Sequence, residues 1–252
     1  MKTAIITGAS SGLGKEFLYA LAEKFSDIEE IWLIARRKDR LEELASELPD
    51  RKIIPVGLDL TDMESFSTLK ALFEEKQPQI DVLINNAGFG TLGDFADATL
   101  ESQGGMIDLN VRALTEMTLV ALPYMQAGSF IVNTCSIASF APSPRMAVYS
   151  STKAYVLSFS KALREELKKR KINVVAVCPG PMATEFLDIA KITGNSKTFE
   201  LLPYCDPKKV ARKGLEAGKR GKAVYTPRAF YKLERVLAKL LPHSFVMKFT
   251  KT

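Results

Sequence analysis

Short apolar runs alternate along the chain with longer segments in which apolar residues recur every three or four positions. The apolar runs predict strands at residues 4–6, 30–35, 52–58, 81–84, 129–134, 172–178 and 222–225. The periodic segments predict helices at 13–25, 41–48, 63–73, 106–122, 149–167 and 207–217. Strands that are apolar throughout and alternate with helices are typical of a parallel sheet covered on both faces. We therefore expect an α/β fold, a doubly wound Rossmann-type sheet of seven mostly parallel strands.

The length of 252 residues suits one domain of this kind, so we expect a single domain over residues 1–252. The chain has no apolar run of about 18 residues, and Met1 and Lys2 lead directly into the first strand, so we expect neither a membrane span nor a signal peptide. Three cysteines without metal-like spacing fit a reducing compartment. These features predict a cytoplasmic protein without a metal site.

The formal net charge of +6 is concentrated near the C-terminus. Residues 206–252 carry thirteen Lys and Arg against three Asp and Glu, a local charge of +10 that leaves −4 for the first 205 residues. A solvated basic surface and a patch that faces an anionic membrane or ligand both fit this asymmetry. No nucleic-acid reader motif accompanies the charge, so we expect no nucleic-acid partner.

Three glycines, Gly8, Gly12 and Gly14, fall where the first strand ends and the first helix begins. Glycine at such a turn lets the backbone approach a pyrophosphate and present free amides at a helix N-terminus. We therefore predict a dinucleotide site. Its loop also includes Ser10, Ser11 and Leu13.

The second strand ends in Ala35, Arg36 and Arg37, where a fold of this kind meets the adenosine ribose. A carboxylate here would bind the ribose 2′-hydroxyl, whereas a small residue followed by guanidinium groups accommodates a 2′-phosphate. The pattern predicts NADP(H) rather than NAD(H). The alternative is that both arginines only begin the next exposed helix.

Polar residues follow the third and fourth strands as well. Asp59 and Leu60 come after the third strand, where Asp59 either lines the nucleotide site or caps a turn before a helix beginning at Thr61 or Asp62. The fourth strand runs into Asn85-Asn86-Ala87-Gly88, which taken alone is a turn signal.

Tyr149 and Lys153 are four residues apart at the start of a predicted helix and therefore share a face. A phenol has an unperturbed pKa of about 10, and a nearby ammonium favours the phenolate and lowers that pKa. The pair has the make-up of an acid–base catalyst with its tuning group. Ser136 follows the fifth strand and lies thirteen residues earlier.

Together, the TGxxxGxG loop, the NNAG segment and the Ser136, Tyr149 and Lys153 set resemble the single-domain short-chain dehydrogenase/reductase family from Thr3 to about Thr184. The resemblance implies that Tyr149 exchanges a proton with the substrate, Lys153 also binds the nicotinamide ribose, and Ser136 orients the carbonyl. It further implies that Asn110 is the family's helix asparagine, which holds a water in a proton relay. The cofactor contacts that it implies are Asp59, Asn86, Ala87, Gly88, Pro179, Gly180 and Thr184. A homodimer or homotetramer is also implied.

The segments after Thr184 are not diagnostic of the family. Residues 185–204 are apolar enough to close over a hydrophobic substrate as a flap, or to form an ordinary surface segment. Residues 227–252 form an amphipathic basic tail. Such a tail can lie on a membrane, cover the substrate pocket or pack in a subunit interface.

These observations predict an NADP(H)-dependent oxidoreductase that transfers hydride between nicotinamide and a secondary alcohol or ketone. The apolar flap and tail favour a bulky lipophilic substrate such as a steroid. A 3-oxoacyl thioester reductase is the enzymatic alternative. A non-catalytic NADP(H)-binding regulator or scaffold is the alternative of another class.

Overall fold

The computed structural model describes residues 1–192, 194 and 196–250, so parts of the predicted flap (193, 195) and tail (251–252) lie outside the described residues. Seven parallel strands form one sheet in the order β3-β2-β1-β4-β5-β6-β7. The strands are β1 Lys2–Thr7, β2 Glu30–Ala35, β3 Lys52–Gly57, β4 Gln79–Asn85, β5 Met125–Thr134, β6 Asn173–Val177 and β7 Val224–Tyr225. This architecture confirms the predicted doubly wound sheet.

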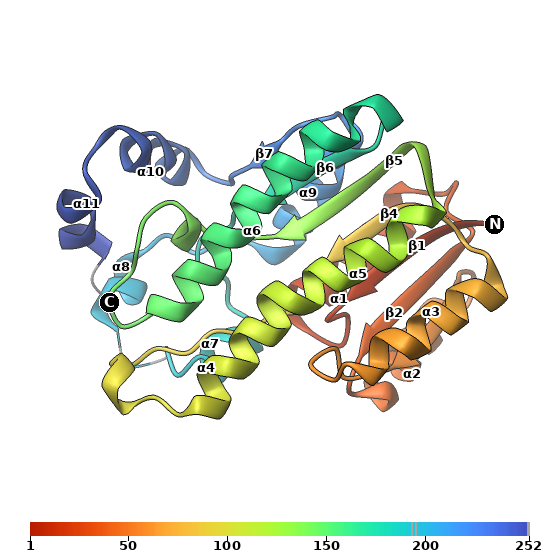
Figure 1. Cartoon of the computed structure of the whole chain (residues 1–252), viewed down its shortest axis with the longest axis horizontal. Coiled ribbons are helices and arrows are strands. Elements are labelled where there is room, and N and C mark those ends of the chain that lie inside the picture. The colour runs from red at the N-terminus through yellow and green to blue at the C-terminus, as the bar shows by residue number, and fades with distance from the viewer. Residues whose placement is uncertain (193, 195, 251–252) are drawn as a thin grey trace.

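Helices cover both faces of the sheet (Figure 1). One face packs against α1 Gly12–Lys24, α2 Lys38–Ser46 and α9 Pro207–Lys219, and the other against α3 Glu64–Lys76, α5 Leu114–Ala121 and α6 Ala147–Glu166. Alternate strand residues serve the two faces, as in β1, where Ala4 and Ile6 join the first core and Ile5 joins the second. The apolar strands predicted from the sequence are therefore buried on both sides.

The remaining helices gather at the carboxyl ends of the strands (Figure 1). They are α4 Leu100–Ile107, α7 Glu185–Ile189, α8 Lys197–Leu201, α10 Ala229–Leu240 and α11 His243–Thr250. Parallel strands end at one edge, and the connecting loops leave a crevice there, which is where ligands bind in open α/β sheets.

Two predicted segments differ from the structure. The apolar pattern predicts no helix between residues 73 and 106, but α4 begins at Leu100, where the Thr99 side chain accepts a hydrogen bond from the Ser102 amide at 3.2 Å and caps the helix. The predicted helix 106–122 is one rod that includes a π-helical turn, Asp108–Ala113, before α5. π-Turns of this kind are frequent at functional sites.

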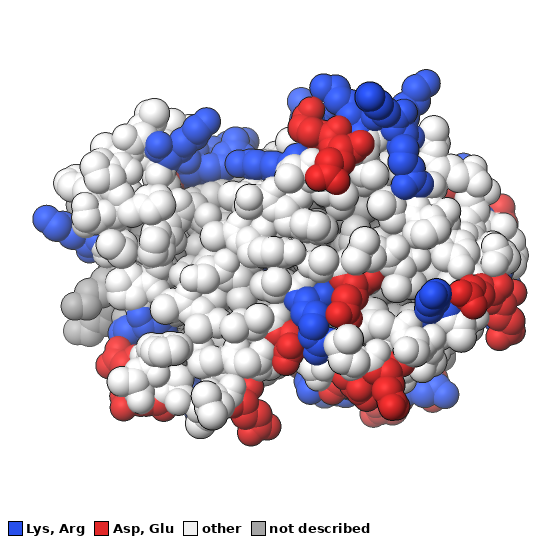
Figure 2. Space-filling view, in the orientation of Figure 1, with Lys and Arg blue, Asp and Glu red and all other residues white. Residues whose placement is uncertain are grey.

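The amphipathic tail is broken at Pro242 into α10 and α11. Figure 2 shows lysine and arginine side chains beside a largely uncharged surface over these two helices. Within the described part of the chain, none of the helices combines the length and apolar character needed to cross a membrane. The basic tail is therefore a surface feature at the edge where the strands end.

Candidate active site

A cavity of about 930 Å³ lies at the carboxyl ends of the strands. It extends from the glycine-rich loop, past the start of α6, to α10 and α11. Most residues predicted to bind cofactor or substrate line it: Gly8, Ser10, Ser11, Gly12, Leu13, Arg36, Arg37, Asp59, Leu60, Asn86, Ala87, Gly88, Ser136, Tyr149, Lys153, Pro179, Gly180 and Thr184. Gly14 and Asn110 are not among its lining residues.

The glycine-rich loop needs its glycines for two physical reasons. Gly8 and Gly12 have φ of +65° and +53°, a region that costs other residues strain. A Cβ on Gly8 would lie 2.7 Å from the Cα of Ala87, and one on Gly14 would collide with the Gly8 carbonyl oxygen. The loop therefore packs tightly against α1 and the NNAG segment and leaves the cavity side open.

Asn86 ties three neighbouring strands together at this edge. Its Nδ2 donates to the carbonyl oxygens of Thr7 and Gly8, both at 3.2 Å, and its Oδ1 accepts from the Thr134 hydroxyl at 3.2 Å. The Thr7 hydroxyl in turn accepts from the Asn86 and Ala87 amides at 3.0 and 3.1 Å. The NNAG segment is thus a brace that fixes the loop geometry, in addition to lining the cavity.

Arg37 lies over the glycine-rich loop. Its Nη2 donates to the hydroxyls of Ser10 and Ser11, both at 3.0 Å, and to Glu185 at 3.1 Å. Ser11 is the N-cap of α1 but makes no capping hydrogen bond within the described residues. The first amides of α1 are therefore left for an anion, beside a guanidinium group. These residues fit a dinucleotide with a third phosphate.

Glu185, at the start of α7, also accepts from Arg40 at 2.7 Å. The hydrogen bonds from Arg40 and Arg37 lower the pKa of Glu185 below its usual range. Sequence reasoning did not single out this contact, because the flap and the second helix are 145 residues apart. The flap is therefore joined to the predicted 2′-phosphate site.

Asp59 combines the two roles that the sequence left open. It lines the cavity, and its Oδ1 accepts from the amide and hydroxyl of Thr61 at 2.9 and 2.7 Å. Burial opposes its ionisation, but the Thr61 hydrogen bonds and the charge of Arg36 outweigh it and lower the pKa of Asp59. Helix α3 begins only at Glu64, later than predicted.

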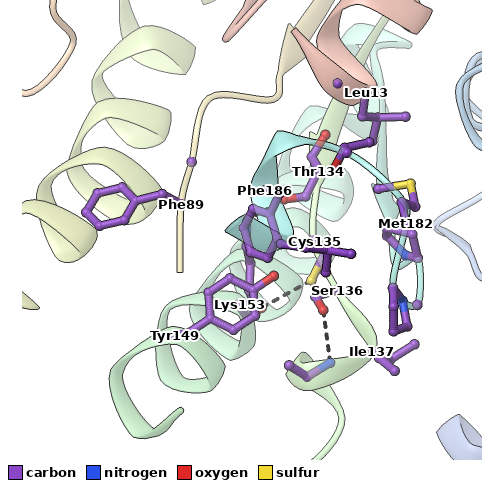
Figure 3. A pocket seen from close by; sticks show the side chains of 18 of the residues that line it. Leu13, Phe89, Thr134, Cys135, Ser136, Ile137, Tyr149, Lys153, Met182 and Phe186 are labelled. Carbon is purple, nitrogen blue, oxygen red and sulfur yellow. Dashed lines mark hydrogen bonds between the residues drawn. The ribbon is translucent and has the colours of Figure 1, made fainter. Parts of the chain in front are cut away.

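Tyr149 and Lys153 lie on one face of α6, and Ser136 lies opposite them at the end of β5 (Figure 3). Lys153 Nζ is 5.8 Å from the centre of the Tyr149 ring and donates to the Thr134 carbonyl oxygen at 2.9 Å. Gly90 allows the Tyr149 ring to approach, because a Cβ there would lie 2.8 Å from Tyr149 Cδ2. The three predicted catalytic side chains therefore meet at one point of the cavity.

The electrostatics of this pair correct one expectation. Lys153 was expected to lower the pKa of Tyr149, but burial raises it to about 12, despite a hydrogen bond with Ser136. Burial also lowers the pKa of Lys153, whose ammonium is held by a carbonyl oxygen rather than by the phenol. Desolvation outweighs the pairing of the two groups here. Tyr149 is thus a protonated phenol, ready to donate.

Asn110 occupies the π-turn and is 1% exposed. Its Nδ2 donates to the Phe89 carbonyl oxygen at 2.8 Å and the Thr152 hydroxyl at 3.1 Å, and its Oδ1 accepts from the Phe89 amide at 3.0 Å. The side chain is fully engaged in joining the NNAG loop to α6. Its water-holding role stays a prediction.

The segment after β6 closes the cavity near the reacting groups. The Pro179 carbonyl oxygen accepts from the Ile137 amide at 3.0 Å, which joins this segment to the loop that carries Ser136. A Cβ on Gly12 would lie 3.4 Å from Thr184 Cβ, so Thr184 borders the glycine-rich loop. Pro179, Gly180 and Thr184 therefore line the cavity, and their contacts with a cofactor stay a prediction.

Residues of the predicted flap and tail line the cavity, and Glu234 and Phe245 among them were not singled out from the sequence. They are apolar except for one, and the set is Phe186, Leu187, Phe199, Leu202, Phe230, Leu233, Glu234, Leu237, Leu241 and Phe245. Glu234 is the one acid in the tail, so a lone acid within a basic amphipathic segment was the available signal. The tail covers the pocket, which is one of the three roles that the sequence left open.

Comparisons with known proteins show the family of this chain. A family profile described as short chain dehydrogenase matches residues 2–192. An NADP-dependent 3-hydroxy acid dehydrogenase from Schizosaccharomyces pombe is 37% identical over 191 residues, covering 73% of this chain and 73% of that protein.

Two solved structures are similar over nearly the whole chain. A short-chain dehydrogenase from Sphingobium yanoikuyae in complex with NADPH has a TM-score of 0.81 and 32% identity, covering 95% of each chain. The bulky-bulky ketone specific alcohol dehydrogenase from Comamonas testosteroni has a TM-score of 0.77 and 29% identity, covering 95% of this chain and 92% of that one. The chain therefore belongs to the short-chain dehydrogenase family, as its motifs predict.

Proposed function

We propose that this protein is an NADP(H)-dependent oxidoreductase that reduces a bulky lipophilic ketone or oxidises the matching secondary alcohol. The observation that carries the proposal is that one cavity joins the glycine-rich loop and Arg37 to Ser136, Tyr149 and Lys153. The relatives named for NADP or solved with NADPH support the cofactor.

In reduction, the bound nicotinamide supplies the hydride. Tyr149 donates its phenolic proton to the carbonyl oxygen as negative charge develops there, and Ser136 holds that oxygen by a hydrogen bond. Lys153 donates to the Thr134 carbonyl oxygen beside the phenol, where a positive charge on its ammonium group would stabilise the tyrosinate that remains. Oxidation of an alcohol uses the same groups in reverse.

The size and polarity of the cavity support a bulky lipophilic substrate. Beyond Tyr149 the walls are mostly aliphatic and aromatic side chains of α7, α8, α10 and α11. Burial of apolar substrate surface against them contributes about 25 cal/mol per Å². Specificity for bulky ketones in the Comamonas testosteroni enzyme points in the same direction.

A 3-hydroxy acid or 3-oxoacyl thioester is the second candidate substrate. It is favoured by the 37% identity with the Schizosaccharomyces pombe 3-hydroxy acid dehydrogenase.

For assembly we propose a homodimer or homotetramer of single-domain chains, which light scattering tests. We also propose that the protein resides in the cytoplasm, which cell fractionation tests.

The test is cofactor oxidation by purified protein with a panel of bulky ketones, 3-oxoacyl thioesters and 3-oxo acids. NADPH should be consumed with bulky ketones, and Tyr149→Phe should lower kcat by about 10³-fold because the proton donor is lost. Calorimetry should show unchanged NADPH binding in the variant, with much weaker NADH binding in both proteins.

Two results would contradict the proposal. Turnover retained by Tyr149→Phe would show that Tyr149 is not the proton donor. Comparable affinity for NADH and NADPH would show that Arg37 does not form a site for the 2′-phosphate. Tight NADPH binding without turnover of any carbonyl would instead favour a cofactor-binding regulator.

A further inference from the structure

Glu234 brings a carboxyl group into the apolar part of the cavity. Helix α10 turns Tyr231, Glu234 and Ala238 inward, at helical spacing of three and four residues, and Tyr231 and Ala238 are 0% and 4% exposed. Glu234 lines the cavity together with Leu233 and Leu237. The helix is basic on its outer side, so this acid is on the face where a hydrophobic residue is expected.

The carboxyl group of Glu234 is unusually poor in partners. Its Oε2 is shielded from solvent and has no hydrogen-bond partner in the described part of the chain. No ion pair to it is found among the described residues, although its neighbour Arg235 donates to the Thr226 hydroxyl at 3.2 Å. Burial alone raises the pKa of Glu234 to about 7. A buried unpaired carboxyl lowers stability, so its position requires an explanation.

Resting on the proposed function, we propose that Glu234 is a specificity-determining residue that accepts a hydrogen bond from a hydroxyl or amine group of the substrate, remote from the reacting carbonyl. The substrate class is then a bulky, mainly apolar ketone or alcohol with a second, hydrogen-bond-donating substituent. Its apolar body packs against Leu233 and Leu237, and its donor binds the carboxyl group of Glu234 where that side chain lines the cavity.

The same contact discriminates against other substrates. A wholly apolar ketone would leave the carboxyl group unpaired and lose the water around it, which costs binding free energy. A substrate with a remote carboxylate would place two like charges in an apolar cavity. Glu234 therefore opposes free acids whose carboxylate reaches α10.

The experiment uses the full-length protein and a series of ketones with one carbon skeleton and a remote hydrogen, hydroxyl, primary amine or carboxylate. For each ketone, kcat/KM with NADPH is measured in the wild type, Glu234→Gln, Glu234→Leu and the control Glu166→Gln, an exposed carboxyl on α6. Binding of the matching alcohols to the NADP⁺-loaded proteins is measured by calorimetry.

We expect the wild type and Glu166→Gln to prefer hydroxyl or amine ketones over the unsubstituted one by about 10- to 100-fold in kcat/KM. Glu234→Leu should lose both preferences and favour the unsubstituted ketone. Glu234→Gln should keep part of a hydroxyl preference, since its amide oxygen still accepts, but lose an amine preference, which identifies the donor. The carboxylate ketone should improve in both Glu234 variants.

Equal kcat/KM across the series in the wild type, or a preference that survives Glu234→Leu, would overturn the inference while ketone turnover upholds the proposed function. If no ketone is reduced, the proposed function fails, and calorimetry still decides the inference. Donor-bearing alcohols that bind the wild type no better than Glu234→Leu would then overturn it.

Discussion

At the scale of single residues, burial sets the charge state of the titratable groups around the cavity. Tyr149 has its pKa raised and Lys153 has its pKa lowered by the same cause, so each is pushed toward its neutral form. Glu234 follows the same rule without any compensating partner. Sequence spacing placed Tyr149 beside Lys153 but could not show which of desolvation and pairing is the larger effect.

The raised pKa of Glu234 predicts a pH dependence of stability. The folded carboxyl binds its proton up to about pH 7, whereas the unfolded one releases it near its usual value of 4.5. The contribution of proton binding by Glu234 to the stability of the folded state is therefore complete below pH 4.5 and is lost as pH rises through 7. Relative to Glu234→Gln, the wild type should lose about 2 kcal/mol of unfolding free energy over this range, allowing for partial exposure.

Urea unfolding of cofactor-free protein at pH 5 and pH 8 measures this effect. The difference between wild type and Glu234→Gln is the relevant quantity, because carboxyl groups with lowered pKa values, such as Asp59 and Glu185, act in the opposite sense in both proteins. An equal difference at the two pH values would show that Glu234 titrates normally.

At the scale of elements, Tyr231 anchors α10 to the core. The Tyr231 ring packs directly against Gly180, where a Cβ would overlap it, and its hydroxyl donates to the Pro203 carbonyl oxygen at 2.8 Å. Tyr231 thus joins the tail, the end of β6 and the flap, and it holds the inner face of α10 over the cavity.

Removal of this anchor should cost stability. Tyr231→Ala should lower the free energy of unfolding by about 3–5 kcal/mol, because a large fully buried ring is replaced by a cavity. Tyr231→Phe should cost only about 1 kcal/mol, the hydrogen bond alone. Denaturant unfolding checks both, with the exposed Lys232→Ala as control. If Tyr231→Ala lost no more than Lys232→Ala, the docking of α10 on the core would be wrong.

At the scale of the whole molecule, the sequence was sufficient to predict those features that depend on residues close together along the chain. Apolar strands and helical periodicity predicted the sheet, and Gly8, Gly12, Tyr149 and Lys153 were found by local spacing. The far wall of the cavity was not predictable in this way, because Glu234 meets the rest of the site only through tertiary packing. The π-turn at Asn110 was missed for a similar reason, since its apolar periodicity is that of an ordinary helix.

The contact between Glu185 and Arg37 has a consequence for cofactor choice. A 2′-phosphate that binds Arg37 competes with the carboxylate of Glu185, which accepts a hydrogen bond from Arg37 Nη2 at 3.1 Å. Glu185→Gln should therefore tighten NADPH binding by a few-fold, in line with the ~0.2–1 kcal/mol of an exposed ion pair, and leave NADH binding unchanged.

Calorimetric Kd values for both dinucleotides test this, with Glu200→Gln, an exposed carboxyl on α8, as control. Equal tightening for NADH would place the effect elsewhere than at the 2′-phosphate. The preference for one dinucleotide is then a competition between two anions for one guanidinium group, in which Glu185 can give up Arg37 and still be held by Arg40.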